Sequence, residues 1–500
     1  MALNPDIPEI LFSDSSDPAA ARRISRLAAA GQLRKLHAGI YTPNLDSPAE
    51  TIVARNWHRI AGKLAPGGVM SHRSAFDGKP HDGRLILTRG KTRRLINLPG
   101  LEIHIFPGYP AQADGIMTDT PYGALFLSSE PRRLLENLVV AKGWADKVLP
   151  RQEIENYLDR VLSIRGEARL NELRDHARLL SARLGFDTQM RRLDGIVGAL
   201  MGTHATKKLR SKQAVARAQG RPYDPDRLHV FDTLFGALNS SPLPEIPSPA
   251  TTARARENFA FLEAYFSNFI EGTTFTVEEA EDIVFKGRHI ANRHEDAHDV
   301  LGTFQAATRP PWRDRPPATV DAFLQWLMDA NALIMLKRPE RNPGQWKDKP
   351  NQSGSTLFVL PDLVPGTLRE GFDRIMALGN PLARALMTMF VVTEVHPFRD
   401  GNGRTARLAM NCHLSAAGLC RIIVPTVYRE DYLSPLKALS NNRNPQPLLA
   451  AMSRAQAWSA AFSYDRPLDG VEKDMAACNA FKDDLINFKL LFPENAAKPL

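Results

Sequence analysis

The segment HPFRDGNGRTAR, residues 396–407, is the strongest constraint on how this chain can fold. Gly401 and Gly403 allow a tight turn, because glycine adopts backbone angles that other residues resist. Apolar residues recur at helical spacing in the stretch before it, 380–395, and its two last arginines are three positions apart. The sequence therefore predicts a helix, a glycine turn and a second helix that begins in this segment.

Length, charge and cysteine content set broad limits. A chain of 500 residues is too long for one core and suggests about three domains. A net charge of +9 suits a polyanionic partner such as nucleic acid or nucleotide phosphates. Cys412, Cys420 and Cys478 fit neither a metal motif nor a disulfide framework, which favours a reducing compartment. With no signal peptide and no membrane span in the sequence, we expect a cytoplasmic protein, monomeric or oligomeric.

Residues 18–42 predict a helix followed by a basic hairpin. Pro18 suits a first helical turn, Ile24 lies on the apolar face, and Gly31 can end the helix. Two short strands around Gly39 follow, and a helix before a basic hairpin is the ending of a winged helix. We expect DNA contacts from the cationic side chains here, which are Arg22, Arg23, Arg26, Arg34 and Lys35.

This stretch, ISRLAAAGQLRKLHAGIY, resembles the winged-helix opening of the AbiEi-like antitoxin family of bacterial abortive-infection toxin–antitoxin systems. GGVMSHRSAFDG (67–78) and LPGLEIHIFPGY (98–109) resemble the segments that follow in that family. The resemblance covers about the first 200 residues. It implies a DNA-binding antitoxin module.

A basic segment follows the helical pattern of 166–202. It reads KKLRSKQAVARAQGR, residues 207–221, and holds six cations without an acid. Such a segment either contacts the phosphate backbone of a nucleic acid or forms a solvated charged face. The sequence leaves both interpretations open.

Two short motifs suggest other chemistry in the second half. HEDAH, His294 to His298, matches the H-E-x-x-H zinc pattern, but no third ligand stands at the usual spacing. GNGRTA, 401–406, matches a dinucleotide-binding pattern, which counts only after a strand. The zinc motif lacks a third ligand, and the residues before 401 have helical spacing and not the pattern of a strand, so the sequence favours neither alternative.

The residues of the 396–407 segment can together handle a nucleotide phosphate. His396 titrates near neutrality and can take a proton from a hydroxyl, and Asp400 can hold Mg²⁺. Gly401, Asn402 and Gly403 can form an anion nest at a helix start, where the asparagine can donate to a phosphate. The two arginines, Arg404 and Arg407, can grip phosphate oxygens.

The whole segment resembles the Fic family signature, H-x-F-x-[DE]-G-N-G-R-x-x-R, and matches it in full. The resemblance covers roughly residues 255–460, about the size of one domain. It implies in-line transfer of a nucleotide monophosphate from ATP to a Ser, Thr or Tyr hydroxyl of a protein, with His396 as base. Gly403 implies AMP transfer, because phosphorylating Doc toxins carry a bulkier residue near that position.

A second element, FSNFIEGTTF (266–275), lies upstream. Ser267 and Glu271 are one helical turn apart, and Gly272 is suited to end the helix. The element is similar to the [ST]-x-x-x-E-[GN] inhibitory helix of Fic proteins, which implies that Glu271 pairs with Arg407 and self-inhibits the enzyme. In some relatives the same glutamate removes AMP from the target, so de-AMPylation is a further hypothesis.

Three further expectations come from the resemblance. Residues 344–360 stand where the family carries its β-hairpin flap, with Lys347 where relatives often have arginine. Tyr432 and Asn441 stand where relatives contact the adenine, although Tyr432 is equally suited to the core. The target protein is unidentified, and the chain itself is a candidate.

The predicted fold class is multidomain and mainly α, with an N-terminal α+β winged-helix-like antitoxin module and a C-terminal all-α Fic fold with a β-hairpin flap. The predicted regions are 1–45, winged-helix-like; 46–165, α+β; 166–238, helical connector with the basic segment; 239–254, Pro/Ser-rich linker; 255–460, Fic domain with an inhibitory helix at about 255–272; and 461–500, helical tail.

The sequence thus predicts a self-inhibited protein adenylyltransferase that uses ATP and Mg²⁺. The rival is a DNA-binding regulator, or a toxin–antitoxin or phage-defence fusion, in which the Fic domain senses nucleotide.

Overall fold

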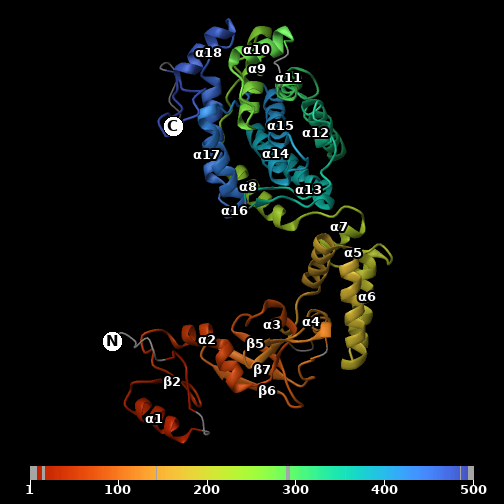
Figure 1. Cartoon of the computed structure of the whole chain (residues 1–500), viewed down its shortest axis with the longest axis vertical. Coiled ribbons are helices and arrows are strands. Elements are labelled where there is room, and N and C mark those ends of the chain that lie inside the picture. The colour runs from red at the N-terminus through yellow and green to blue at the C-terminus, as the bar shows by residue number, and fades with distance from the viewer. Residues whose placement is uncertain are drawn as a thin grey trace. The chain divides into compact units, whose positions relative to one another are not determined.

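The structure, a computed structural model, describes residues 8–13, 17–113, 115–141, 144–288, 293–354, 356–484 and 486–493. The chain folds into two compact units, Met1–Gln219 and Gly220–Leu500 (Figure 1). The mainly helical, multidomain fold class predicted from the sequence is confirmed. Among the residues described, no helix is both long and apolar enough to cross a bilayer.

The first unit begins with the predicted helix and hairpin. Helix α1 spans Pro18–Ala29, and the side chain of Asp17 caps it by accepting hydrogen bonds from Ala19 and Ala20. Strands β2 (Arg34–His37) and β3 (Ile40–Thr42) pair antiparallel, and β1 (Leu11–Phe12) adds to β3.

A six-stranded mixed sheet follows in the same unit, in the order β6-β7-β5-β4-β9-β8. Its parallel neighbours are β5 with β7 and β4 with β9, and the other pairs are antiparallel. The strands are β4 (Val69–Met70), β5 (Arg84–Thr88), β6 (Arg94–Leu98), β7 (Leu101–Phe106), β8 (Thr120–Tyr122) and β9 (Leu125–Leu127). Helix α2 (Ala49–Leu64) precedes these strands, α3 (His72–Asp77) lies between β4 and β5, and α4 (Glu130–Asn137) follows β9.

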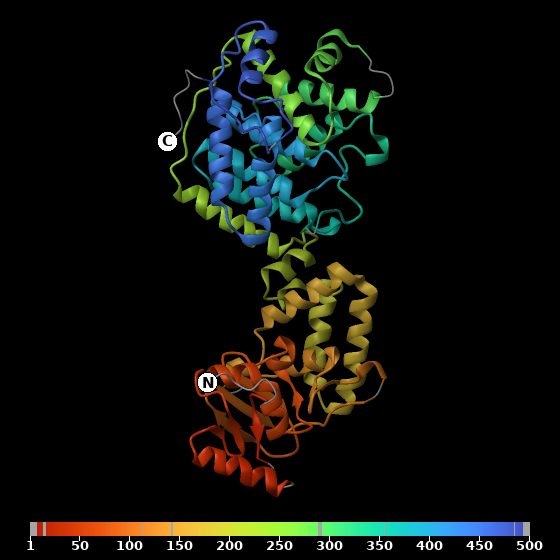
Figure 2. The same ribbon diagram turned by 60° about the vertical axis from the view of Figure 1, so that its left-hand side comes forward.

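Helices complete the first unit. The long helix α5 (Arg151–Leu184) breaks at Gly166, where φ is +76°, and it packs against α6 (Asp187–Leu200), as both views show (Figures 1 and 2). The basic segment contains α7 (Lys212–Ala218). In that helix Arg217 pairs with the buried carboxylate of Asp159, so this cation is committed within the unit.

The second unit is a helical domain around two central helices, α14 (Pro381–Val395) and α15 (Asn402–Ala416). In Figure 1 these two lie between α17 on one side and α12 and α13 on the other. The surrounding helices are α8 (Pro225–Ser240), α9 (Ala253–Ile270), α10 (Val277–Lys286), α11 (His294–Thr308), α12 (Val320–Ile334), α13 (Val364–Ala377), α16 (Arg429–Asn442), α17 (Gln446–Ala460) and α18 (Leu468–Ala477).

Sequence signals explain the central pair. Asn380 caps α14 by accepting from the Ala383 amide at 3.0 Å, and Pro381 fills the first helical position. Almost every residue of α14 is buried and most of them are apolar, so the helix forms the middle of the core. This core fixes the end of α14, which is where the candidate site begins.

The predicted linker 239–254 and the predicted helical tail 461–500 differ from their predicted roles in the structure. The proline-rich stretch 239–254 belongs to the second unit, where the Cys420 and Ser248 amides donate to Ile246 and Gly418. The predicted helical tail 461–500 contains α18, and residues 478–493 hold no further helix where described; 485 and 494–500 lie outside the described residues.

Candidate functional site

The loop between α14 and α15 is held in a strained shape. His396 ends α14 with a φ of +51°, and Gly401 begins α15 with a φ of +76°. A side chain at Gly401 would meet Met335 and Asn331 at 2.8–2.9 Å. Glycine is therefore required here both for the turn and for the close approach of α12.

Asn402 stabilises this loop from within. Its side-chain oxygen accepts from the Phe398 amide at 2.8 Å, and its side-chain nitrogen donates to the Phe398 carbonyl at 2.9 Å. The sequence predicted that Asn402 donates to a phosphate. One N–H of the amide donates to Phe398 and leaves the second N–H, so the phosphate contact of Asn402 stays a prediction.

A second asparagine, which the sequence did not single out, supports the loop from α12. The Asn331 side chain donates to the Asp400 carbonyl at 3.0 Å and accepts from the Gly344 amide at 2.9 Å. It thereby ties the loop to the segment that leads into the predicted flap. Nothing in a lone asparagine within a helical pattern could have indicated this role.

His396 is oriented for use as a base. Its Nδ1 lies 3.3 Å from the Thr393 carbonyl, which can only accept, so Nδ1 carries the proton and Nε2 the lone pair. The ring stacks on Phe358 with centroids 3.9 Å apart. Burial, followed by the charge of Lys347, lowers the pKa of His396 to about 4, so the imidazole is neutral at physiological pH.

Lys347 is itself unusual. It is buried, and its Nζ donates to Asn351 at 2.6 Å and to the Val395 carbonyl at 3.2 Å. Burial, with a smaller effect from Arg227, lowers the pKa of Lys347 to about 7. This amine thus changes its charge near neutrality beside the candidate base.

Asp400 stands at the mouth of the loop. Its Oδ1 accepts from the Gly401 amide at 2.6 Å and lies 3.6 Å from an Arg404 nitrogen, and its side chain is about a third exposed. Mg²⁺ is commonly bound by one or two carboxylates together with substrate phosphates, and a part-exposed carboxylate beside an anion-binding loop fits that arrangement.

Arg404 points into a buried ionic network. Its Nη1 contacts Asp299 at 2.6 Å, and Asp299 also pairs with Arg338 at 2.9 Å. The sequence did not assign Asp299 a role, although it adjoins the HEDAH motif. The carboxylate therefore holds the first of the two predicted phosphate-gripping arginines.

We expect Asp299→Ala to destabilise the second unit by about 3–5 kcal/mol, because two nearly buried guanidinium groups would lose one shared carboxylate. Urea unfolding measures this. Asp296→Ala is the matched control, since Asp296 also pairs with Arg338 but is a third exposed, and it should cost about 1 kcal/mol or less. Equal losses in the two variants would contradict the account of the network.

Arg407 is held by the end of α9. Its Nη2 contacts Glu271 Oε1 at 2.7 Å and the Ser267 carbonyl at 2.8 Å, and its Nε donates to the Ser267 hydroxyl at 3.0 Å. Burial raises the pKa of Glu271, but the charges of Arg407 and Arg404 outweigh it, and the pKa lies below its ordinary value. The structure thus contains the ion pair that the resemblance implied, and Gly272 follows it with a φ of +93°.

Gly403 makes room for this ion pair. A methyl group on Gly403 would overlap Glu271 Oε1 and lie 3.0 Å from Arg407 Nη1. Gly403 lies in helix α15, where alanine would otherwise be preferred by about 1 kcal/mol. The glycine is therefore explained by the approach of the α9 carboxylate as well as by any role toward nucleotide.

A double-mutant cycle tests this packing. We expect Gly403→Ala to cost about 1–3 kcal/mol in the parent chain, through overpacking against Glu271. In a Glu271→Gly background the same change should be neutral or stabilising by up to about 1 kcal/mol. Urea unfolding of the four chains gives the coupling, and an unchanged cost in both backgrounds would contradict a clash with the carboxylate.

The flap and the predicted adenine contacts differ in exposure. Strands β10 (Gln352–Ser353) and β11 (Thr356–Leu357) form an antiparallel hairpin where the flap was predicted. Tyr432 is buried, with Arg407 5.9 Å from its ring, whereas Asn441 is exposed. The adenine contacts assigned to these two residues stay predictions.

The competing motifs find no support in the fold. Within the described ranges no cluster of three His, Cys, Asp or Glu side chains could hold a metal, and HEDAH begins helix α11. The residues before GNGRTA form helix α14 in place of the strand that a dinucleotide site requires.

The cations predicted to contact DNA lie on α1 and β2. Arg22, Arg23, Arg26 and Lys35 are exposed. Arg34 donates to the Ser47 carbonyl at 2.7 Å and to the Leu45 carbonyl, so it holds a neighbouring loop. DNA contact by this group stays a prediction.

Comparisons with known proteins agree with the sequence at the catalytic loop. Residues 321–414 match the Fic/DOC family. Two similar curated proteins are the protein adenylyltransferases Fic of Drosophila erecta and Drosophila melanogaster. Each is 27% identical over 241 residues, which cover 45% of this chain and 45% and 46% of the relative, respectively. The chain thus spans less than half the length of these relatives.

Solved structures of Fic proteins are also similar. Fic-1 (residues 134–508) from C. elegans is 20% identical, with a TM-score of 0.36, and the match covers 64% of this chain and 98% of that one. A Fic-domain signaling protein from Bacteroides thetaiotaomicron is 18% identical, with a TM-score of 0.37, and the match covers 49% and 98%.

The family match, residues 321–414, covers the loop together with α13, α14 and most of α12 and α15. This match confirms the resemblance of the 396–407 segment to the Fic family signature. The AbiEi-like resemblance of the first 200 residues stays a prediction.

Proposed function

We propose that this Fic-domain chain is a protein adenylyltransferase, which transfers AMP from ATP to a hydroxyl side chain of a protein. One observation carries the proposal: a neutral imidazole, two arginines and a glycine turn converge on one loop, and an upstream glutamate occupies one of the arginines. The proposed base, the phosphate-binding arginines and the inhibitory glutamate thus lie together at one site.

The chemistry is an in-line displacement at the α-phosphorus of ATP. The hydroxyl oxygen of the target forms a bond to phosphorus, its proton passes to Nε2 of His396, and the bond to pyrophosphate breaks. Arg404 and Arg407 stabilise the negative charge of the phosphates. Asp400 would hold Mg²⁺, which would neutralise charge on the leaving pyrophosphate.

Autoinhibition follows from the charge on Arg407. In the present state its Nε and Nη2 donors are taken by Ser267 and Glu271, and the Glu271 carboxylate neutralises its charge, which weakens its binding of a phosphate oxygen. Withdrawal of Glu271 frees the guanidinium group. The β10–β11 hairpin provides short strand edges on which an extended target segment can pair, beside the Phe358 ring that covers His396.

Label transfer tests the proposal. The Glu271→Gly chain is incubated with ATP labelled at the α- or the γ-phosphate, and with the other three nucleoside triphosphates labelled at the α-phosphate. We expect the protein itself or an added target to gain label only from an α-phosphate, most strongly from ATP. Label from the γ-phosphate would show phosphorylation and overturn the proposal, as would no transfer from any nucleotide.

DNA binding by the first unit is a second candidate function. The exposed arginines Arg22, Arg23 and Arg26 on α1, next to the β2–β3 hairpin, favour it. Retardation of the chain's own promoter DNA should weaken steeply with salt, and Arg23→Glu should reduce it. No retardation at low salt would exclude this function.

A further inference from the structure

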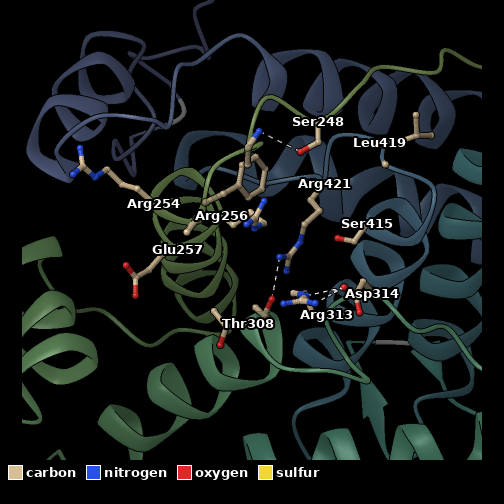
Figure 3. A pocket seen from close by; sticks show the side chains of 15 residues that line it. Ser248, Arg254, Arg256, Glu257, Thr308, Arg313, Asp314, Ser415, Leu419 and Arg421 are labelled. Carbon is tan, nitrogen blue, oxygen red and sulfur yellow. Dashed lines mark hydrogen bonds and ion pairs between the residues drawn. The ribbon is translucent and has the colours of Figure 1, made fainter.

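The second unit contains a large cavity apart from the catalytic loop. It has a volume of about 670 Å³, within the range of about 300–1,000 Å³ that is typical of small-molecule sites. Its walls come from the proline-rich stretch around Ser248, the start of α9, the ends of α11 and α15, and the segments that follow α11 and α15. Figure 3 shows these side chains around the opening.

The lining is rich in arginine. Arg254 and Arg256 lie on the first turn of α9, and Arg313 and Arg421 come from the loops after α11 and α15. Two carboxylates share the lining, Glu257 and Asp314, so cations outnumber anions by two.

Two of the four arginines pair with carboxylates, whereas Arg256 contacts a neutral group. Arg313 pairs with its neighbour Asp314 at 2.6 Å. Arg421 pairs with the buried Glu263, and its Nη1 donates to the Ala307 carbonyl at 3.1 Å, which anchors it in the wall (Figure 3). Arg256 is exposed, and its Nη1 donates to the neutral Thr251 carbonyl at 2.5 Å.

The remaining lining suits more than a simple anion. The lining also includes Ser248 and Ser415 and the apolar side chains of Phe259 and Leu419, whereas the Thr308 hydroxyl donates to the Phe304 carbonyl of its own helix. Cations for a phosphate, hydroxyls for hydrogen bonds and an apolar wall for a ring together match a phosphorylated small molecule of nucleotide size.

The cavity is separate from the candidate active site. None of the residues 396–407 lines it. Helix α15 carries Arg404 and Arg407 on its first turns and Ser415 at its other end, and its 15 residues extend about 22 Å. Helix α9 likewise begins at the cavity and ends next to Glu271.

We propose that this cavity is a second binding site, for a phosphate-bearing small molecule of nucleotide size. The phosphate contacts Arg256 and Arg313 at the mouth, and the ring lies toward Phe259. The proposal does not depend on AMP transfer, because it uses none of the residues assigned to that reaction.

Arginine footprinting tests the site residue by residue. The full chain is treated with phenylglyoxal in the presence of AMP, ATP or pyrophosphate, or of sodium chloride at equal ionic strength, and modified peptides are quantified by mass spectrometry. We expect AMP and ATP to protect Arg256 and Arg313 more than pyrophosphate does, and sodium chloride not to protect them. Arg404 and Arg407 lie in other peptides and report the active site independently.

Variants provide the second arm. By calorimetry, Arg256→Glu should weaken AMP binding at this site by about tenfold or more, as the loss of one charge-assisted contact predicts. Lys437→Glu, an equal charge change at an exposed site on α16, is the control and should leave it unchanged. Equal thermal stability of both variants excludes misfolding.

Three results would overturn the proposal: protection by nucleotides no greater than by salt, equal protection by pyrophosphate and AMP, or equal weakening by the two substitutions. The first and third would show only general attraction of anions. The second would show a site for phosphate without the ring.

Discussion

Glu271→Gly is expected to raise AMP transfer by about two orders of magnitude, the effect of one well-placed donor to a reacting phosphoryl group. The carboxylate now holds Arg407 at 2.7 Å and fills the space beside Gly403. Its removal frees both the cation and the space. Initial rates of label transfer from α-labelled ATP, for the parent and the variant, measure the gain.

Glu271→Gln separates charge from volume. Glutamine keeps the size of the side chain next to Gly403 and can still accept a hydrogen bond from Arg407, but it removes the charge. We expect a rate between those of the parent and the glycine variant. A glutamine variant as slow as the parent would assign the inhibition to steric blockage, and a glycine variant no faster than the parent would remove Glu271 from regulation.

His396→Ala is expected to reduce transfer by about a hundredfold or more in the Glu271→Gly background, because a positioned base contributes about 10²–10⁴. The pH profile gives a second readout. The pKa of His396 is lowered to about 4, so the imidazole stays unprotonated, and competent as a base, above that pH. We expect protonation of His396 to leave kcat/KM unchanged between about pH 8 and pH 5.5. The acid limb, where kcat/KM falls because His396 takes up a proton, should appear only toward pH 4.

Lys347→Met tests the cause of this profile. At the pH of the acid limb Lys347, with a pKa of about 7, is protonated, and its charge helps to lower the pKa of His396. Removing that charge should raise the histidine pKa and move the acid limb to higher pH. A profile that falls already near the ordinary histidine pKa in the parent, or a limb that does not move in the variant, would contradict the environment described for the base.

The loop between α14 and α15 could be predicted from sequence because the residues that determine its shape are adjacent in the chain. Two glycines, a histidine at a helix end and arginines three positions apart specify the turn and the helix start locally. The Glu271–Arg407 pair joins residues far apart in the chain, and it was predicted from a resemblance to known inhibitory helices.

The parts that were missed depend on tertiary packing. Asp299 holds Arg404 and Arg338, and Asn331 holds the loop, because α11 and α12 pack beside α15. Neither residue belongs to a pattern that marks its partner. The sequence also did not indicate that the Asn402 amide closes the loop through Phe398. The pKa of His396 likewise results from burial, which a sequence does not display.

We propose that one loop captures a triphosphate while His396 receives the proton of the incoming hydroxyl. A crystal structure of the Glu271→Gly chain with magnesium and a non-hydrolysable ATP analogue tests it most directly. We predict density for the phosphates over the Gly401–Gly403 turn, contacts from Arg404 and Arg407, and the α-phosphorus facing His396 Nε2. Phosphates bound elsewhere, or a His396 ring turned away from them, would contradict the account.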